Sequence, residues 1–128
     1  MSIGLLEKVS GHLKDAGLMA GYDDKYYSWT DKDVEGSAGF VLFQMAGTSG
    51  IRNATVQSPD VRLLLVCKKD KLREGNNEAD AIFANFAGMT KPTGILKLEP
   101  IGTVMGPYYL DNGRGVFEIV VRCFVQDM

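Results

Sequence analysis

The last third of the chain contains two long apolar stretches that flank a strong turn signal. Residues 95–110 read ILKLEPIGTVMGPYYL, residues 115–126 read GVFEIVVRCFVQ, and Asp111-Asn112-Gly113 lies between them. Asn or Asp followed by Gly is typical of the tight turn of a β-hairpin. In the second arm, apolar residues alternate with Glu118 and Arg122, as in a strand with one buried face. This hairpin commits the chain to an antiparallel sheet, and the prolines and glycines of its first arm predict bulges or an edge position.

Two further strands precede the hairpin. Residues 40–46 are apolar on both faces, which is typical of a strand inside a sheet, and residues 61–68 (VRLLLVCK) form the clearest strand of the sequence. Residues 21–39 and 47–60 show neither the apolar alternation of a strand nor the apolar spacing of a helix, so we expect them to be irregular.

Two amphipathic helices are predicted. Residues 2–16 repeat apolar side chains at helical spacing, and residues 78–87 do the same after Asn77, which can cap them. The length of 128 residues fits one domain, residues 1–128. We therefore predict an α+β fold in the order α-β-β-α-β-β: a four-stranded, mainly antiparallel sheet with two helices packed on one face.

The charge and the apolar pattern limit the classes of partner. Fourteen basic residues oppose sixteen acidic ones, so the chain has no broad basic footprint for sequence-specific nucleic-acid binding. No stretch approaches the ~20 apolar residues of a membrane span. The first residues carry Glu7 and Lys8 within their apolar pattern, so we expect no export signal and synthesis in the cytoplasm. Cys67 and Cys123 lie in strand-like runs, where buried free thiols are expected.

A glycine-containing segment follows the strand at 40–46 and resembles a phosphate-binding loop at first sight. Such a loop needs a lysine after its glycines and a helix behind them. Here Gly47, Thr48, Ser49 and Gly50 are followed by Ile51 and Arg52, and the stretch runs on to a proline without a helical pattern. We therefore predict no nucleotide site, and interpret Gly47, Thr48, Ser49, Gly50, Ile51 and Arg52 as a surface loop.

The acidic stretch at 31–42 matches only part of a calcium loop. Asp31, Asp33 and Glu35 fall at ligand positions, but the position that requires a bidentate glutamate is Leu42. No metal site is predicted. The chain also lacks a nucleophile pattern, and its only histidine, His12, lies beside the apolar stripe of the first helix, so we predict neither catalysis nor a cofactor.

Four aromatic residues, Tyr22, Tyr26, Tyr27 and Trp29, are interleaved with aspartates. Those charges would repel a phosphate backbone, which argues against base stacking. Tyr and Trp are enriched where a sheet face is covered or where a protein interface is anchored. We interpret the four residues as candidate interface aromatics.

The order of the elements, with GFVLFQMAGTSGIRNATVQSPDVRLLLVC in the middle and GVFEIVVRCFVQDM at the end, resembles the tail terminator proteins of long-tailed, lambda-like bacteriophages. The resemblance covers nearly the whole chain. It implies a non-enzymatic virion protein, assembled in the bacterial cytoplasm, that forms a hexameric ring on the tail tube. The ring would stop polymerisation of the tube protein and present a surface to the head–tail connector or neck protein.

The resemblance also implies a use for the glycine-containing segment. We expect loop 47–60 to be mobile in the free subunit and to become ordered against a neighbour or the tube. Two alternatives stay open at this point: a neck or head-completion protein of the same virion, and a small cytoplasmic ligand-binding α+β domain.

Overall fold

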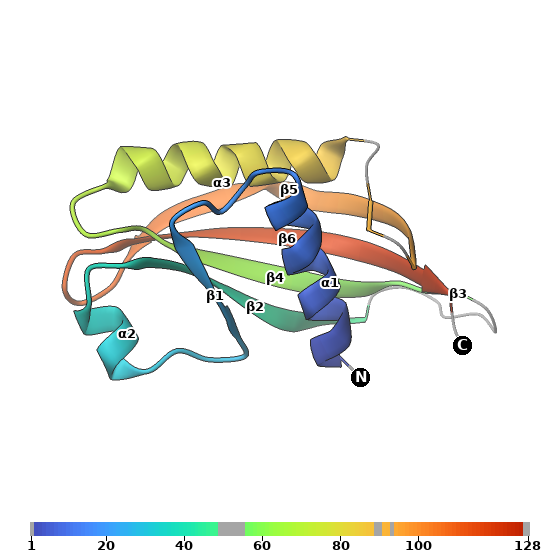
Figure 1. Ribbon diagram of the computed structural model, residues 1–128, viewed down its shortest axis with the longest axis horizontal. Helices are drawn as coiled ribbons and strands as arrows, with labels where there is room; N and C mark the ends of the chain where they lie inside the picture. The colour runs from blue at the N-terminus through green and yellow to red at the C-terminus, as the bar shows by residue number, and fades with distance from the viewer. Residues whose placement is uncertain (1, 49–55, 89–90, 93, 127–128) are drawn as a thin grey trace.

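A computed structural model of the chain describes residues 2–48, 56–88, 91–92 and 94–126, and Figure 1 shows their arrangement. Its elements are α1 (Ser2–Asp15), β1 (Tyr22–Tyr26), α2 (Asp31–Glu35), β2 (Gly39–Thr48), β3 (Val56–Gln57), β4 (Pro59–Val66), α3 (Leu72–Ala87), β5 (Ile95–Tyr109) and β6 (Gly115–Gln126). The predicted α+β class is therefore confirmed.

The described strands form one mixed sheet. Strands β1, β2, β4 and β6 are neighbours in this order, and β5 pairs with the other side of β6. Val56 pairs with Gln126 and Asp60 with Arg122, four positions further along both strands, so β3 continues β4 in the same register. The sheet thus has five strand positions. All pairs are antiparallel except β1–β2, which is parallel.

The predicted four-stranded sheet was wrong by one strand, because β1 was not recognised. Its sequence, YDDKY, has only five residues and three charges, as expected of a short edge strand. Its Tyr22 is nevertheless buried. The segment that connects β1 to its parallel neighbour contains α2, which the sequence analysis also left irregular.

The helices α1 and α3 lie on the same face of the sheet, as predicted (Figure 1). Leu6, Val9 and Leu13 of α1 are fully buried there. Ala79, Ile82 and Phe86 of α3 join the same core cluster. Facing them are alternate residues of the central strands, namely Val41, Phe43, Val61, Leu63, Leu65, Phe117, Ile119 and Val121. Burial of this common apolar surface drives the two layers together.

The predicted start of the second helix was wrong. Helix α3 begins at Leu72, six residues before 78, and Asn77 lies inside it rather than at its cap. Gly75, Asn76 and Asn77 are weak helix formers, which hid the first turns in the sequence. Tertiary packing overrides this preference, since Gly75 is buried against Cys67 at the end of β4.

The closing hairpin is confirmed. Gly113 has φ +88°, and the Leu110 N–H donates to the Arg114 carbonyl across the turn, at 2.9 Å. Strand β5 occupies a sheet edge, and its register shifts three times, around positions that include Gly102 and Gly106. Both glycines have positive φ, as bulges often require. The predicted irregular stretch at 47–60 also contains strand residues at its two ends, while residues 49–55 lie outside the described part.

Candidate interaction surfaces

The face of the sheet opposite α1 and α3 is covered in part by residues 27–38, which we call the strap. Trp29 packs edge-on against Phe40, with 5.6 Å between ring centroids. Phe40 belongs to a small buried cluster with Val66 and Val116. The strap contains α2, but no residue of α2 is buried. Apolar burial therefore holds this segment through few side chains.

Arg114, at the start of β6, supplies a polar anchor for the strap. Only 5% of the residue is exposed, and its guanidinium lies 5.7 Å from the centre of the Phe40 ring. Its N–H groups donate to the main-chain carbonyls of Cys67, Asp33, Val34, Gly36 and Ala38. Burial lowers the pKa of Arg114, but an arginine stays charged at any physiological pH. A planar cation with several donors thus links the hairpin turn, the end of β4 and the strap.

Three further contacts hold the strap: one from the hairpin turn, one within the strap and one from β1. The Asn112 amide donates to the Val34 carbonyl at 2.7 Å. The Asp33 carboxylate accepts from the Thr30 N–H at 2.8 Å and pairs with Lys25 at 3.0 Å. Thr30 N–H and Lys25 hold the pKa of Asp33 below its ordinary value. The stretch that partly matched a calcium loop is therefore a capped helical turn, with Asp33 in a capping box.

The four candidate aromatics occupy different environments. Tyr22 lies in the large core under the helices, and its buried hydroxyl has no hydrogen-bond partner in the described structure. Tyr26 stacks near Phe43 with a centroid distance of 5.8 Å, and Trp29 belongs to the cluster under the strap. Tyr27 is 44% exposed. The structure therefore does not bring the four side chains together on one surface.

The predicted contact loop lies mostly outside the described residues. Gly47 and Thr48 end β2, where their backbone pairs with Asp60 and Pro59 of β4. Ser49, Gly50, Ile51 and Arg52 fall in the part that the structure does not describe.

In the described part of the chain, most of the exposed large apolar side chains lie on the edge strand β5. Leu96 is 48% exposed, Met105 37%, Tyr108 52% and Tyr109 62%, while Tyr27 and Leu72 lie on other elements. Tyrosines and methionines at a surface are typical of protein interfaces. The sequence analysis missed these residues because it treated 95–110 only as a hairpin arm. The adjacent pair Tyr108-Tyr109 was the available signal of an exposed aromatic residue. Successive side chains of a strand point to opposite faces of the sheet, so a sheet with one buried face cannot bury both.

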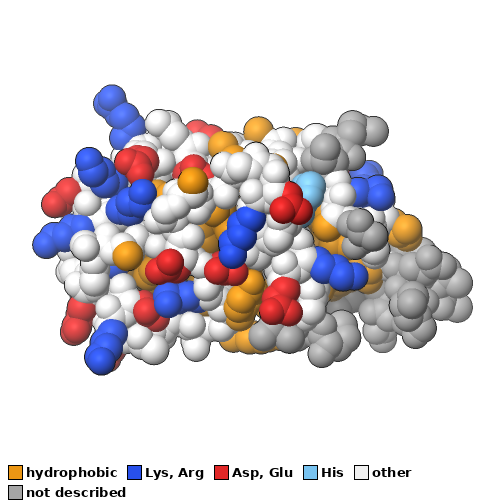
Figure 2. All heavy atoms as spheres, viewed as in Figure 1, with side chains coloured by type: hydrophobic (Ala, Val, Ile, Leu, Met, Phe, Trp, Pro, Cys, Tyr) orange, Lys and Arg blue, Asp and Glu red, His pale blue; other side chains and the backbone are white. Residues whose placement is uncertain are grey.

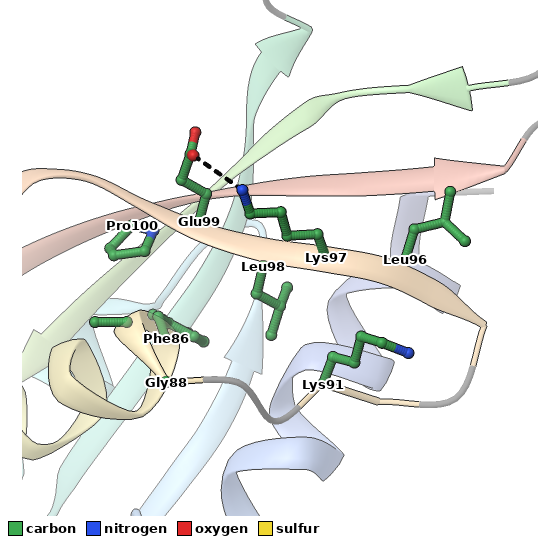
Figure 3. Close-up of a pocket in the computed structure, with 9 residues that line it drawn as sticks. Phe86, Gly88, Lys91, Leu96, Lys97, Leu98, Glu99 and Pro100 are labelled. Carbon is green, nitrogen blue, oxygen red and sulfur yellow. Dashed lines mark hydrogen bonds and ion pairs between the residues drawn. The ribbon is translucent and has the colours of Figure 1, made fainter.

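An apolar groove lies where α3 ends and β5 begins (Figure 3). Its volume is about 610 Å³. Leu98 points toward Phe86 at the floor, whereas Lys97 and Glu99 lie on the other side of the strand, 3.5 Å apart. Leu96 and Lys91 are exposed at the rim. The ionisable groups drawn here are two lysines and one carboxylate that is already paired, so the groove offers apolar contact rather than acid–base chemistry.

The residues considered for chemistry serve the fold. His12 Nε2 lies 3.0 Å from Asn85 Oδ1 and links α1 to α3. Cys67 and Cys123 are buried free thiols, as predicted. Burial raises the pKa of Cys123 to about 12, which keeps it as an unreactive thiol. In the described residues, no helix has both the length and the apolar character to cross a membrane.

The fold and surface define a class: a small α+β domain that exposes aromatic and apolar side chains along one sheet edge, as proteins that act by contact with other proteins do. The family model described as phage tail termination protein matches residues 3–127. The chain belongs to this family of structural phage tail proteins, and the suspected resemblance is confirmed. No curated protein matches the sequence significantly.

Proposed function

We propose that the chain forms a closed ring, expected to be hexameric, on the end of the phage tail tube. The ring occupies the site of the next tube ring, which stops polymerisation, and its free side receives the head–tail connector or neck protein. The single observation that carries the proposal is the family match over residues 3–127. The mechanism is geometric and requires no reaction.

The shape of the sheet supports a ring subunit. A heterologous ring contact requires two different surfaces on each subunit, so that the same contact can repeat until it closes. The two edges of the sheet differ strongly: β1 is short and charged, whereas β5 is long and carries four exposed apolar side chains. We assign the contacts between subunits to β1, with Tyr27 beside it, and to the part of β5 that carries Leu96 and Met105.

The segment Gly47–Arg52 keeps its proposed role as a contact with a neighbouring subunit or with the tube. Its first residues continue β2 at the end of the molecule that lies opposite α2 (Figure 1). Hydrogen exchange of the free subunit and of the assembled ring tests this role. We expect protection of 47–60 to rise on assembly, and equal protection in both states would argue against it.

Electron microscopy of tails assembled without this gene tests the function itself. We expect tubes of uncontrolled length. Normal tails that lack heads would instead favour the neck protein considered above. Native mass spectrometry of the purified chain provides a physical check: a hexamer at high concentration supports the ring, and a strict dimer contradicts it.

A further inference from the structure

The start of α3 and the β5–β6 turn enclose a hollow at one end of the molecule. Its volume is about 310 Å³, and Lys68, Asp70, Lys71, Leu72 and the backbone of 113–115 line it. Any side chain at Gly115 would run into Leu72. This contact shows which face of the hairpin the hollow occupies.

Tyr109 stands beside this hollow. It pairs directly with Gly115, and side chains of directly paired residues lie on the same face of a sheet. Since the Gly115 face is the one that Leu72 covers, Tyr109 projects next to Leu72. Tyr109 is 62% exposed and Leu72 39% exposed. The hollow therefore has a partly exposed apolar wall at Leu72, and the exposed Tyr109 lies beside the hollow on the same face of the hairpin.

The rim of the hollow is basic. Residues 68–73 read KKDKLR, with four cations and one carboxylate. Lys68 pairs with Glu74 at 3.0 Å. Lys69, Lys71 and Arg73 are exposed, and within the described structure their side chains have no ion pair. Figure 2 shows Lys and Arg side chains projecting at this end of the molecule. This local positive excess stands out in a chain whose net charge is −2.

We propose that the surface formed by Leu72, Tyr109, Lys69, Lys71 and Arg73 binds an acidic segment of a different virion protein, with an apolar side chain of that segment in the hollow. Complementary charge steers such a segment, and the exposed Tyr109 beside the hollow anchors it. Three free cations are too few for tight binding to a nucleic-acid backbone, which makes a protein the better fit.

A second copy of this chain is a poorer fit, because its sixteen acidic residues are nearly matched by fourteen basic ones and some of its carboxylates are already engaged. Seven of them contact the chain's own cations or backbone, namely Asp24, Asp33, Asp60, Glu74, Glu78, Glu99 and Glu118. On α1, the exposed Glu7 and Asp15 each have a lysine next to them in the sequence. The inference requires the tail role of the family but not the ring.

Photo-crosslinking in assembled particles tests the inference. A photoreactive benzoyl-phenylalanine replaces Tyr109, and the crosslinked peptide is identified by mass spectrometry. The matched control carries the same group in place of Leu96, which is exposed at the far end of the same strand. We expect the position-109 probe to capture a net acidic segment of another virion protein, and the position-96 probe not to capture that segment.

Charge reversal completes the test. K69E together with K71E should reduce the crosslink about tenfold or more, because repulsion replaces attraction. The control variant, K8E together with K91E, changes the net charge by the same amount and should leave the crosslink yield unchanged. Exchanging acidic residues of the captured segment for lysines should restore crosslinking to the K69E/K71E variant.

Each other outcome overturns the inference: a crosslink to DNA, to a second copy, to a segment that is not acidic, or none in intact particles. Tail length in the gene deletion reports on the proposed function separately, so the two ideas can fail independently.

Discussion

The two faces of the sheet are covered in different ways. On one face, α1 and α3 bury a continuous set of apolar side chains, many of them with no exposed surface. On the other, the strap covers a buried cluster of three residues, Phe40, Val66 and Val116, and is held by main-chain carbonyls that converge on Arg114. The first attachment depends on buried apolar area, whereas the second depends mostly on hydrogen bonds to one cation.

This difference predicts different modes of opening. Apolar burial is spread over many contacts, so the helical face should open only when the whole domain unfolds. A segment that has no buried residues in its helix, and most of whose side-chain anchors come from Arg114, can open locally. The strap is thus the part of the domain whose stability is set by the fewest groups.

The largest effect is expected on the helical face. Phe86→Ala removes a side chain with no exposed surface from the core, and it should lower the free energy of unfolding by about 3–5 kcal/mol. Denaturant unfolding measures this change. Trp29→Ala is the matched aromatic change on the strap face and should cost less, since Trp29 is only partly buried. An equal loss for both variants would remove the distinction between the faces.

Arg114→Met should have the next largest effect, about 3 kcal/mol, because it leaves several carbonyls without their charged donor. Its signature should be local. Hydrogen exchange should show faster exchange in 27–38, while the amides of α3 keep their protection. Arg114→Lys keeps the charge but loses the planar set of donors, so we expect it to recover little. Equal acceleration in α3 would show that the strap does not open separately.

The same contrast explains how much could be predicted from the sequence. Helices α1 and α3 could be predicted from the helical spacing of their apolar residues, and the closing hairpin from its turn residues. Both are local signals in the sequence. The strap left no such signal, because its anchor, Arg114, is about 80 residues away along the chain. In the sequence, a buried arginine that donates to main-chain carbonyls cannot be told from an exposed arginine beside a turn.

The candidate site was less predictable than the fold. Tyr22 and Trp29 attracted attention as aromatics, yet tertiary packing places them in two different clusters. The surface around Tyr109 combines three elements that meet only after folding: the hairpin, the start of α3 and the turn before it. The charge run 68–73 is visible in the sequence, but on its own it is typical of a solvated turn.

Gly75→Ala tests how closely the helical face is packed. In an exposed helix this change would stabilise by up to about 1 kcal/mol. Here an added Cβ would overlap Cys67 Sγ, so we expect a net loss of about 1–3 kcal/mol in thermal or denaturant unfolding. Combining it with Cys67→Ala removes the sulfur and should recover part of the loss. A neutral or stabilising Gly75→Ala would show that this contact has room to adjust.

The smallest effect concerns the one polar attachment between α1 and β1. Asp24 accepts from Tyr26 at 2.7 Å and from the buried Ser10 at 3.2 Å, and it pairs with Lys14 at 3.0 Å. Burial raises the pKa of Asp24, but the hydrogen bonds from Tyr26 and Lys14 outweigh it and leave the pKa below its ordinary value. Because the pKa of Asp24 is lower in the folded state, its ionised form stabilises the fold. This contribution to stability is complete above the pKa of the unfolded state, about 3.9, and is lost as the pH falls through the pKa of the folded state.

Asp24→Asn should therefore reduce stability by less than about 1 kcal/mol at pH 7, and the difference from the wild type should vanish toward pH 2. Unfolding curves at both pH values measure it. Asp23→Asn is the matched control, because its exposed neighbouring carboxylate has no ion pair in the described structure. A difference for Asp24→Asn that persisted at pH 2 would mean that shape, not charge, holds α1 to β1. Such a result would show that packing holds α1 to β1, in contrast to the polar anchoring of the strap.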